Sequence, residues 1–494
     1  MVAGPAGRGA CGAGLGFLVG SAPVGTRRFL QLLLLIVAVG FAVRLGYALG
    51  VKWDQPIWGD AFKYHHAANG LVDGYGFQTW LPRQLVGGSR LIQLDHAVNG
   101  GRDAIPIGAS ADSPPLFIDY LAGFSLMGLR SFHWHMIASL LLGTASVFTM
   151  GFVGRKIAGA RAGLVAAAIA AVYANFWVND SLVTIESLGI LAGGVLMLLA
   201  YRAWEQPTWA RLLWVGAAGG LAALVRAEFV LLIPLVLIPL VLRRLSDRSV
   251  GERLGMLAAS GAVALLVMSP WLARNLTKWD HPETLSTTSG LALAVSSCDT
   301  TYYGELLGWW SPQCVKGHQP KGDPSVQDTY WRQQAFDYMG AHLSRFPVVA
   351  LARLGRMWEL YRPGTPWGAL GGTNKIAFDV IEGRSQTAAR IALMQYYLLV
   401  PFAIAGAVIM WRRRVTIVPL VSLVIVACVT AVYTFGNTRY RSIAEVAIVA
   451  FAAVAIEAVL GRLLVGWRSR RSQPVLEGTR APGQPDAEAG ANAT

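Results

Sequence analysis

The sequence predicts an all-α polytopic membrane protein with about ten transmembrane helices and two long extracytoplasmic loops that carry short interfacial helices. Hydrophobic residues make up 54% of the 494 residues and charged residues only 14%, and the mean hydropathy is +0.46. This composition is more apolar than that of ordinary soluble proteins. Apolar runs recur along almost the whole chain, so the sequence favours one membrane unit over two soluble domains.

The first apolar run covers residues 29–50 and defines the first predicted span. About 20 apolar residues at roughly 1.5 Å each cross about 30 Å of hydrocarbon. A cleaved signal peptide is the alternative, but the run is long and lacks a convincing small-residue cleavage site. We therefore predict a retained helix that follows a cytoplasmic leader (1–28). Further predicted spans lie at 132–154, 162–179, 184–203, 211–225, 228–242, 254–271, 390–411, 415–435 and 443–461.

Basic residues gather on one side of this arrangement. They occupy the leader, the short turns between predicted spans and the start of the tail (462–494). By the positive-inside tendency this side is cytoplasmic, which leaves residues 51–131 and 272–389 as two outer loops. The net charge of +14 therefore indicates topology and contact with anionic membrane lipids, not nucleic-acid binding. The tail after about residue 472 is rich in Pro, Gly and Ala and is predicted to be disordered.

The second outer loop contains an amphipathic segment and two cysteines. Residues 346–361 have a helical period, but Arg353 and Arg356 interrupt it, so we predict an interfacial helix rather than a span. Cys298 and Cys314 lie in one loop, where an oxidising compartment permits a disulfide, and closing about 15 residues stabilises a fold by roughly 3 kcal/mol. Two unpaired thiols are the alternative. The remaining cysteines have no evident partner: Cys11 and Cys428.

A polar stretch, IWGDAFKYHHAANGLVDGYGF (57–77), directly follows the first predicted span. Its Asp60 would lie at the membrane surface, where a carboxylate can act as a general base on a hydroxyl group. A solvated loop aspartate is the alternative. The stretch also holds His65 and His66, which could bind a metal or relay a proton. Because neighbouring residues of a helix point in different directions, a surface or packing role is favoured for each histidine.

Several motifs occur in a fixed order within this topology: GDAFKYHHAANGLVDGYGF (59–77), SPPLFIDYLAGF (113–124), GLAALVRAEFVLLIPL (220–235), SPWLARN (269–275) and RYRSIAE (439–445). Together they resemble the C-type glycosyltransferases (GT-C). The likeness is greatest to the group that contains protein O-mannosyltransferases and the lipid A aminoarabinose transferase. It covers roughly residues 29–461, which would form the transmembrane catalytic domain.

The resemblance implies a transferase that takes a sugar from a polyprenyl-phosphate donor on the outer face. The acceptor would be a hydroxyl group of an envelope glycan, a lipid or a protein, and the transfer would invert the anomeric configuration. Asp60 takes the role of catalytic base, with Tyr64 nearby. Arginines at outer helix ends would bind the donor phosphate, because a guanidinium can form bidentate bonds to it. A snorkelling interfacial arginine is the alternative for each of them: Arg226, Arg274, Arg439 and Arg441.

Further site candidates are Asp180 and Glu186, near the outer start of the fourth predicted span. Some relatives hold a divalent metal with acids from these loops, whereas the mannosyltransferase branch works without one. Because Ala61 rather than a second acid follows Asp60, a Mg²⁺ or Mn²⁺ cofactor is left open. Arg44 lies inside the first predicted span, where a charge is costly unless it is paired. It would therefore face the same cavity.

The main alternative function is a transporter or flippase for a lipid-linked sugar. Transporters commonly show repeated halves and ionisable groups at mid-membrane, whereas here the acids gather in the outer loops and no internal repeat is visible. Tryptophans of the second outer loop could stack on a sugar acceptor, although anchoring in the interface is the commoner use. They include Trp309, Trp310 and Trp331.

The source and the sugar are only weakly indicated. Arginine greatly outnumbers lysine, a bias typical of GC-rich bacteria, which predicts a bacterial plasma membrane. Mannose and arabinose are the natural sugars to expect on such a carrier. The oligomeric state has no signal in the sequence.

Overall fold

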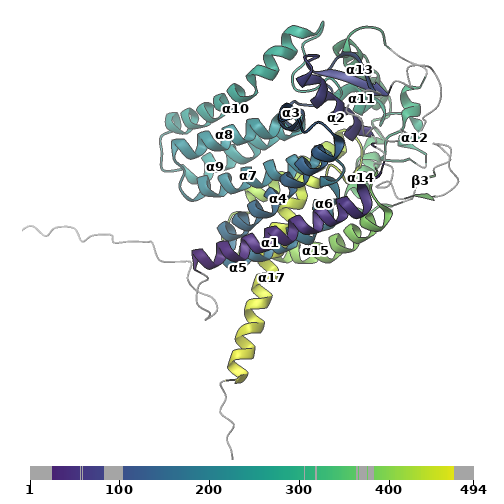
Figure 1. The fold of residues 1–494 in the computed structure, drawn as a ribbon. Coiled ribbons are helices and arrows are strands. Elements are labelled where there is room, and N and C mark those ends of the chain that lie inside the picture. The colour runs from purple at the N-terminus through teal and green to yellow at the C-terminus, as the bar shows by residue number, and fades with distance from the viewer. Residues whose placement is uncertain are drawn as a thin grey trace, which may run out of the picture. The chain divides into compact units, whose positions relative to one another are not determined.

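The computed structural model is mostly α-helical (Figure 1) and divides into two compact units. The larger unit comprises residues 23–457. The smaller comprises both chain ends, of which only the last part of α17 is described. The predictions for Cys11, the leader up to residue 24 and the tail after 471 lie outside the described residues. Those described are 25–55, 57, 59–82, 104–304, 306–316, 320–362, 365–366, 375–376 and 383–471.

Among the described residues, six helices are long and apolar enough to cross a membrane. A seventh candidate is a bent pair, α5 (Ala160–Val172) and α6 (Ala174–Asp180), whose axes differ by 52°. The chain is therefore consistent with a multi-pass membrane protein. The six helices are α1 (Thr26–Tyr47) with the π-helical turn after it (Ala48–Lys52), α4 (Phe132–Ala158), α7 (Glu186–Glu205), α10 (Val250–Lys278), α15 (Gln386–Arg412) and α17 (Ser442–Arg471).

The predicted count of about ten spans is not confirmed. Helices do form in the three remaining predicted spans, but they are short: α8 (Trp209–Ala223), α9 (Leu232–Arg244) and α16 (Val418–Tyr433). A helix of 15 residues such as α8 is only about 22 Å long, less than the roughly 30 Å of the hydrocarbon core. Helices therefore form in all ten predicted spans, and six or seven of them are long enough to cross by themselves.

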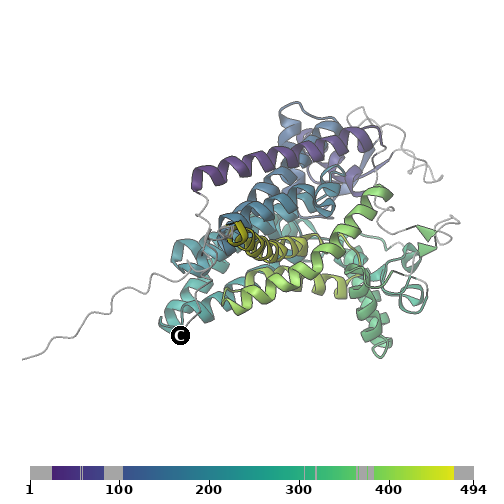
Figure 2. The ribbon, with the colours of Figure 1, turned by 90° about the horizontal axis from the view of Figure 1, so that it is seen from below.

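Helix α17 forms the centre of the larger unit. Its residues 442–455 are all buried and are mostly Ala, Val and Ile. Gly406 lets α15 come close to it, because a Cβ at that position would overlap the carbonyl oxygen of Phe451. Small residues permit such close helix packing in membranes. Figure 2 shows α15 in light green beside α17 in yellow.

The first loop folds into two helices and a hairpin. Helix α2 (Gly59–Val72) is followed by strands β1 (Gln78–Pro82) and β2 (Ala104–Ala109), which pair antiparallel, and then by α3 (Leu116–Leu126). Trp80 of β1 is buried against Gly70 of α2, where any Cβ would overlap the indole ring. This packing fixes the hairpin on α2.

The second loop is also mostly helical, with one further hairpin. The two short hairpins add strands to the mostly helical fold, and strands this short carry no helical period that the sequence could show. The elements are α11 (Ser289–Ala294), α12 (Asp299–Tyr302), a 3₁₀ turn (Pro312–Val315), α13 (Pro324–Ala341), α14 (Phe346–Met357), β3 (Thr365–Pro366) and β4 (Lys375–Ile376).

Helix α14 forms where a short interfacial helix is predicted. Its Leu351 is 70% exposed, whereas Arg353 and Arg356 are buried. Arg353 donates hydrogen bonds to the carbonyl oxygens of Ser296 and Val432, at 2.8 and 2.7 Å. The arginines that interrupt the apolar pattern therefore face the protein, where each donates to at least one backbone carbonyl.

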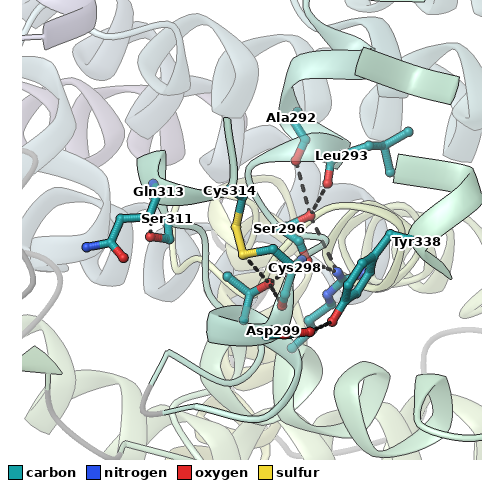
Figure 3. Close-up of a disulfide and its surroundings, with 11 residues drawn as sticks. Ala292, Leu293, Ser296, Cys298, Asp299, Ser311, Gln313, Cys314 and Tyr338 are labelled. Carbon is teal, nitrogen blue, oxygen red and sulfur yellow. Dashed lines mark hydrogen bonds between the residues drawn. A yellow bond between two sulfur atoms is a disulfide. The ribbon is translucent and has the colours of Figure 1, made fainter. Parts of the chain in front are cut away.

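The sulfur atoms of Cys298 and Cys314 are bonded, with their Cα atoms 5.4 Å apart (Figure 3). The bond closes a loop that begins at α12 and ends in the 3₁₀ turn, here called the disulfide loop (298–314). Cys428, in α16, is a free, half-buried thiol.

Candidate active site

Asp60 lies in the first turn of α2. Gly59 before it has φ +50°, a left-handed conformation that a residue without a side chain adopts at little cost. The start of a helix favours a negative charge, because the unpaired N–H groups there carry partial positive charge. The Asp60 side chain remains 34% exposed, so solvent and a substrate can reach it.

Five side chains from four separate segments form a continuous series of ion pairs, here called the charge chain. Arg439 Nη1 lies 2.8 Å from Asp60 Oδ2, and its Nε lies 2.8 Å from Glu186 Oε1. Arg226 Nη1 contacts the same Glu186 oxygen at 2.9 Å, and its Nε contacts Glu228 Oε1 at 2.7 Å. The order is therefore Asp60, Arg439, Glu186, Arg226 and Glu228.

The neighbouring charges determine the protonation of Asp60. Burial would raise its pKa, but Arg439 and then Lys63 outweigh that effect and lower the pKa to about 2. Burial and the negative charge of Asp60 raise the pKa of the nearby Tyr64 phenol above its usual value. At neutral pH Asp60 is thus a carboxylate and Tyr64 a neutral hydroxyl, as acceptor and donor of protons respectively.

Glu186 joins the two arginines at the buried centre of the chain. Its side chain is fully buried, and it is the first residue of α7. Only one of its oxygens is paired: Oε2 has no hydrogen-bond partner among the described residues. An unpaired carboxylate oxygen in a buried position can accept a hydrogen bond from a ligand.

Arg441 lies two residues beyond Arg439 but has different partners. It is 2% exposed, pairs with Glu445 at 2.6 Å and lies 3.8 Å above the ring of Tyr396. Together with Arg384 it lines a small pocket. The rest of the lining contains both polar and apolar residues: Asn175, Val178, Asn179, Glu359, Ala389, Ala392, Leu393 and Thr438.

Two sequence-predicted candidates form no ion pair with the charge chain in the part of the protein that the structure describes. Asp180 forms a fully buried pair with Arg44 at 2.8 Å, which satisfies the charge inside α1. Arg274 donates to the carbonyl oxygen of Ser110 at 2.9 Å and lies 4.7 Å from the centre of the Trp271 ring. The sequence predicts both residues at outer helix ends. In the structure Asp180 pairs with Arg44, and Arg274 pairs with the carbonyl of Ser110.

His65 belongs to a separate, closed ring of buried hydrogen bonds. Its Nδ1 lies 3.0 Å from Nδ1 of His135, whose Nε2 lies 3.0 Å from Ser125 Oγ. Ser125 donates to Asn69 Oδ1 at 2.8 Å, and Asn69 Nδ2 lies 3.4 Å from His65 Nε2. Burial lowers the pKa of His65, so it is neutral. The ring joins α2, α3 and α4, which favours a packing role for this histidine.

Sequence reasoning missed three charged side chains at the site: Lys63, Glu228 and Arg384. Glu228 follows Arg226 by two residues and Lys63 follows Asp60 by three. These short spacings are the sequence signal that could have identified both residues. Arg384 lies two residues before α15 and donates to Asn179 Oδ1 at 3.0 Å, a contact that no local pattern indicates.

The described residues do not fit a divalent metal. No group of three or more His, Cys, Asp or Glu side chains that could hold an ion occurs among them. Mg²⁺ and Mn²⁺ prefer several oxygen ligands, and here Asp60 and Glu186 are both paired with Arg439.

The charge chain and the basic turns lie at opposite ends of the bundle. Lys156 at the end of α4 pairs with Glu205 at the end of α7, and Arg155 donates to Thr26 at the start of α1. Glu186 is at the other end of α7. Twenty residues of α7 separate the two ends by about 30 Å.

Comparison with known proteins finds one matching family model and several solved structures with a similar fold. Residues 112–273 match the family model described as dolichyl-phosphate-mannose-protein mannosyltransferase. No curated protein matches the sequence significantly. Among solved structures, the oligosaccharyltransferase of Archaeoglobus fulgidus in the apo form is 15% identical with a TM-score of 0.51, over 90% of this chain and 52% of that one.

Two further structures are similar at lower scores. The Archaeoglobus fulgidus oligosaccharyltransferase AglB, in complex with an inhibitory peptide and a dolichol-phosphate, is 14% identical with a TM-score of 0.49, over 90% of this chain and 51% of that one. ArnT from Cupriavidus metallidurans, bound to undecaprenyl phosphate, is 15% identical with a TM-score of 0.35, over 91% and 82%. The chain thus spans about half the length of the oligosaccharyltransferase.

Proposed function

Because the family match and the fold confirm the resemblance to C-type glycosyltransferases, we propose that this protein is a membrane glycosyltransferase. It moves a sugar from a polyprenyl-phosphate donor to an acceptor hydroxyl group. The observation that carries the proposal is the charge chain, which puts a partly exposed carboxylate, Asp60, 2.8 Å from an arginine. A proton acceptor and a phosphate partner thus stand side by side, as displacement of a phosphate requires.

The reaction is a single displacement at the anomeric carbon. The acceptor oxygen forms a bond to that carbon while the bond from carbon to phosphate oxygen breaks, which inverts the configuration. The acceptor proton passes to Asp60 Oδ2 or Oδ1, and the polyprenyl phosphate leaves as an anion. Arg439 compensates the charge that develops on the leaving phosphate, as fixed donors do in other enzymes.

Donor binding would also change the basicity of Asp60. With a pKa of about 2, the carboxylate paired to Arg439 is a weak base. A phosphate that shares Arg439 draws its charge away from Asp60, so the carboxylate becomes more basic only when a donor is present. General bases work best when their pKa approaches the operating pH.

The small pocket beside Arg441 would contribute further positive charge to binding of the donor phosphate. Arg384 and Arg441 supply positive charge, and the pocket's apolar wall is formed by Ala389, Ala392 and Leu393 of α15. The outer side of α15 is rich in exposed apolar residues such as Met394 and Leu398. A prenyl chain could therefore follow this helix in the lipid while its phosphate reaches the arginines. Since the described residues do not fit a metal, the arginines alone would compensate the phosphate charge.

We place the site on the extracytoplasmic face of a bacterial plasma membrane, because the basic turns lie at the opposite end of α7. To test this placement, single cysteines are introduced one at a time into a variant that lacks Cys11 and Cys428. Gln334→Cys, on exposed α13, should react with an impermeant maleimide in intact cells. Arg413→Cys, in a basic turn, should react only after lysis. Labelling in the reverse pattern would place the charge chain in the cytoplasm.

The function itself is tested with lipids of the native host. Deletion of the gene should cause one polyprenyl-phosphate sugar to accumulate and one envelope glycan, lipid or protein to lose that sugar, as shown by mass spectrometry. Purified protein in detergent should then transfer the accumulated sugar to material from the deletion strain. A transporter cannot do this in detergent, where no membrane separates two sides. Accumulation without transfer would favour the transporter.

A further inference from the structure

Four aromatic rings continue from the charge chain. Tyr440 lies under the guanidinium of Arg226, 5.3 Å from ring centre to Cζ, and its ring centre is 5.3 Å from that of Phe435. Phe435 in turn lies 6.1 and 6.4 Å from Trp309 and Trp310. Trp309 is 5% exposed, whereas the other three rings are partly exposed. These four residues are here called the aromatic row.

The backbone holds the two halves of this row together. Gly436 donates a hydrogen bond to the carbonyl oxygen of Gly308 at 2.9 Å. Gly308 has φ +76°, and a Cβ there would lie 2.8 Å from the backbone of Ala352. A Cβ at Gly436 would overlap the carbonyl oxygen of Arg353. Only glycine fits both positions, and their contact sets the two tryptophans beside Phe435.

The disulfide loop fixes the row from the other side. Trp309 and Trp310 lie within this loop, which the bond between Cys298 and Cys314 closes (Figure 3). Arg353 of α14 ties Ser296, just before the loop, to Val432, just before Phe435. An aromatic anchor in the membrane interface needs no such connection to charged groups. The placement beside the charge chain therefore requires another explanation.

We propose that the aromatic row binds a sugar ring of the acceptor, so that the acceptor is a carbohydrate rather than a peptide or a lipid. The proposal rests on the proposed glycosyltransferase function. A sugar ring has an apolar face of C–H groups, which can pack on an aromatic ring, and a rim of hydroxyl groups that need polar partners. Partly exposed rings that adjoin carboxylates provide both.

The polar partners lie at the Tyr440 end of the row. Arg226 contacts both the Tyr440 ring and Glu186, so the unpaired Oε2 of Glu186 is close to this end. It can accept a hydrogen bond from a sugar hydroxyl. Asp60, joined to Glu186 through Arg439, can take the proton of another. A lipid tail offers no hydrogen-bond donor to the unpaired Oε2 of Glu186.

The test measures sugar contact by saturation-transfer NMR on the full-length protein in lipid nanodiscs. The probes are the methyl glycosides of mannose and of arabinose, with a threonine-containing tripeptide for comparison. Saturation of the protein's aromatic protons should reach ring C–H protons of at least one glycoside. In Trp310→Ala this signal should fall about tenfold, because removing one aromatic contact weakens binding by roughly that factor. Trp310→Phe should retain a substantial part.

The matched control is Tyr303→Ala. Tyr303 is 54% exposed and belongs to the same disulfide loop, but its ring contacts are with Arg345 and His342. This variant should give the parental signal. Equal signals in Trp310→Ala and the parent, no signal from either glycoside, or a signal from the tripeptide alone would each overturn the proposal. No donor turnover is involved, so these outcomes are independent of the lipid profiling that tests the function.

Discussion

Asp60→Asn should lower the rate of sugar transfer by about 10² to 10⁴, the range typical of losing a general base. Asparagine has the size of aspartate and keeps a carbonyl oxygen for Arg439, but it cannot accept the acceptor's proton near neutral pH. Arg439 retains its pair with Glu186, so the fold and donor binding should survive. The measurement is transfer by purified protein, with donor binding followed separately.

The control for this variant is Asp73→Asn. Asp73 follows the same helix, is exposed and pairs with Arg130 at 2.6 Å, away from the charge chain. It should transfer sugar at the parental rate. If folded Asp60→Asn protein does so too, Asp60 is a loop aspartate and the base lies elsewhere.

The pH dependence of the parent follows from the same carboxylate. A base acts when deprotonated, so activity is lost as the pH falls through its pKa. Because Arg439 holds the pKa of Asp60 at about 2 in the free protein, kcat/KM should stay constant from neutral pH down to about pH 4 before this group matters. The value of kcat should begin to fall at a higher pH than kcat/KM does. The reason is that the bound donor shares Arg439, so the pKa of Asp60 is higher in the complex.

Glu186→Gln should strongly destabilise the protein. Glu186 is fully buried and its Oε1 contacts both Arg226 and Arg439. Without its charge, two guanidinium groups share one neutral oxygen. Removing one partner of a buried ion pair commonly costs about 3–5 kcal/mol. We expect a marked fall in the thermal unfolding temperature of the detergent-purified protein.

Glu228→Gln provides the comparison, because Glu228 is 24% exposed at the end of the charge chain and, among the described residues, forms an ion pair only with Arg226. A pair that solvent reaches contributes less than a buried one. Its unfolding temperature should therefore change much less. Equal temperatures for both variants and the parent would mean that the charge chain does not stabilise the fold.

Much of the site could be predicted because topology brings helix ends together. Asp60, Glu186, Arg226 and Arg439 are far apart in sequence, yet each lies at an outer end of a predicted span. Helices that cross repeatedly place alternate ends at the same level, so the order of spans alone gathers these residues. The role of each arginine still depends on which side chain it pairs with, and the sequence does not show that pairing.

Side-chain direction is what the sequence could not supply. Arg274 also lies toward an outer helix end, but Trp271 and the carbonyl of Ser110 draw it into local contacts. Asp180 turns inward to Arg44. The number of spans stays a prediction for a different reason: an apolar run shows that a segment avoids water but does not show how many residues its helix retains.

The hydrogen bonds in the ring around His65 all donate in one direction, and the carbonyl oxygen of Arg130 determines which. Asn69 Nδ2 also donates to the carbonyl oxygen of Arg130 at 3.1 Å, so its amide cannot flip, and Oδ1 must accept from Ser125. Ser125 must then accept from Nε2–H of His135, whose Nδ1 accepts from Nδ1–H of His65. His65 Nε2 takes the second amide hydrogen. A backbone oxygen that touches neither imidazole therefore selects the tautomer of both, and an extra proton on either ring would set two hydrogens against each other.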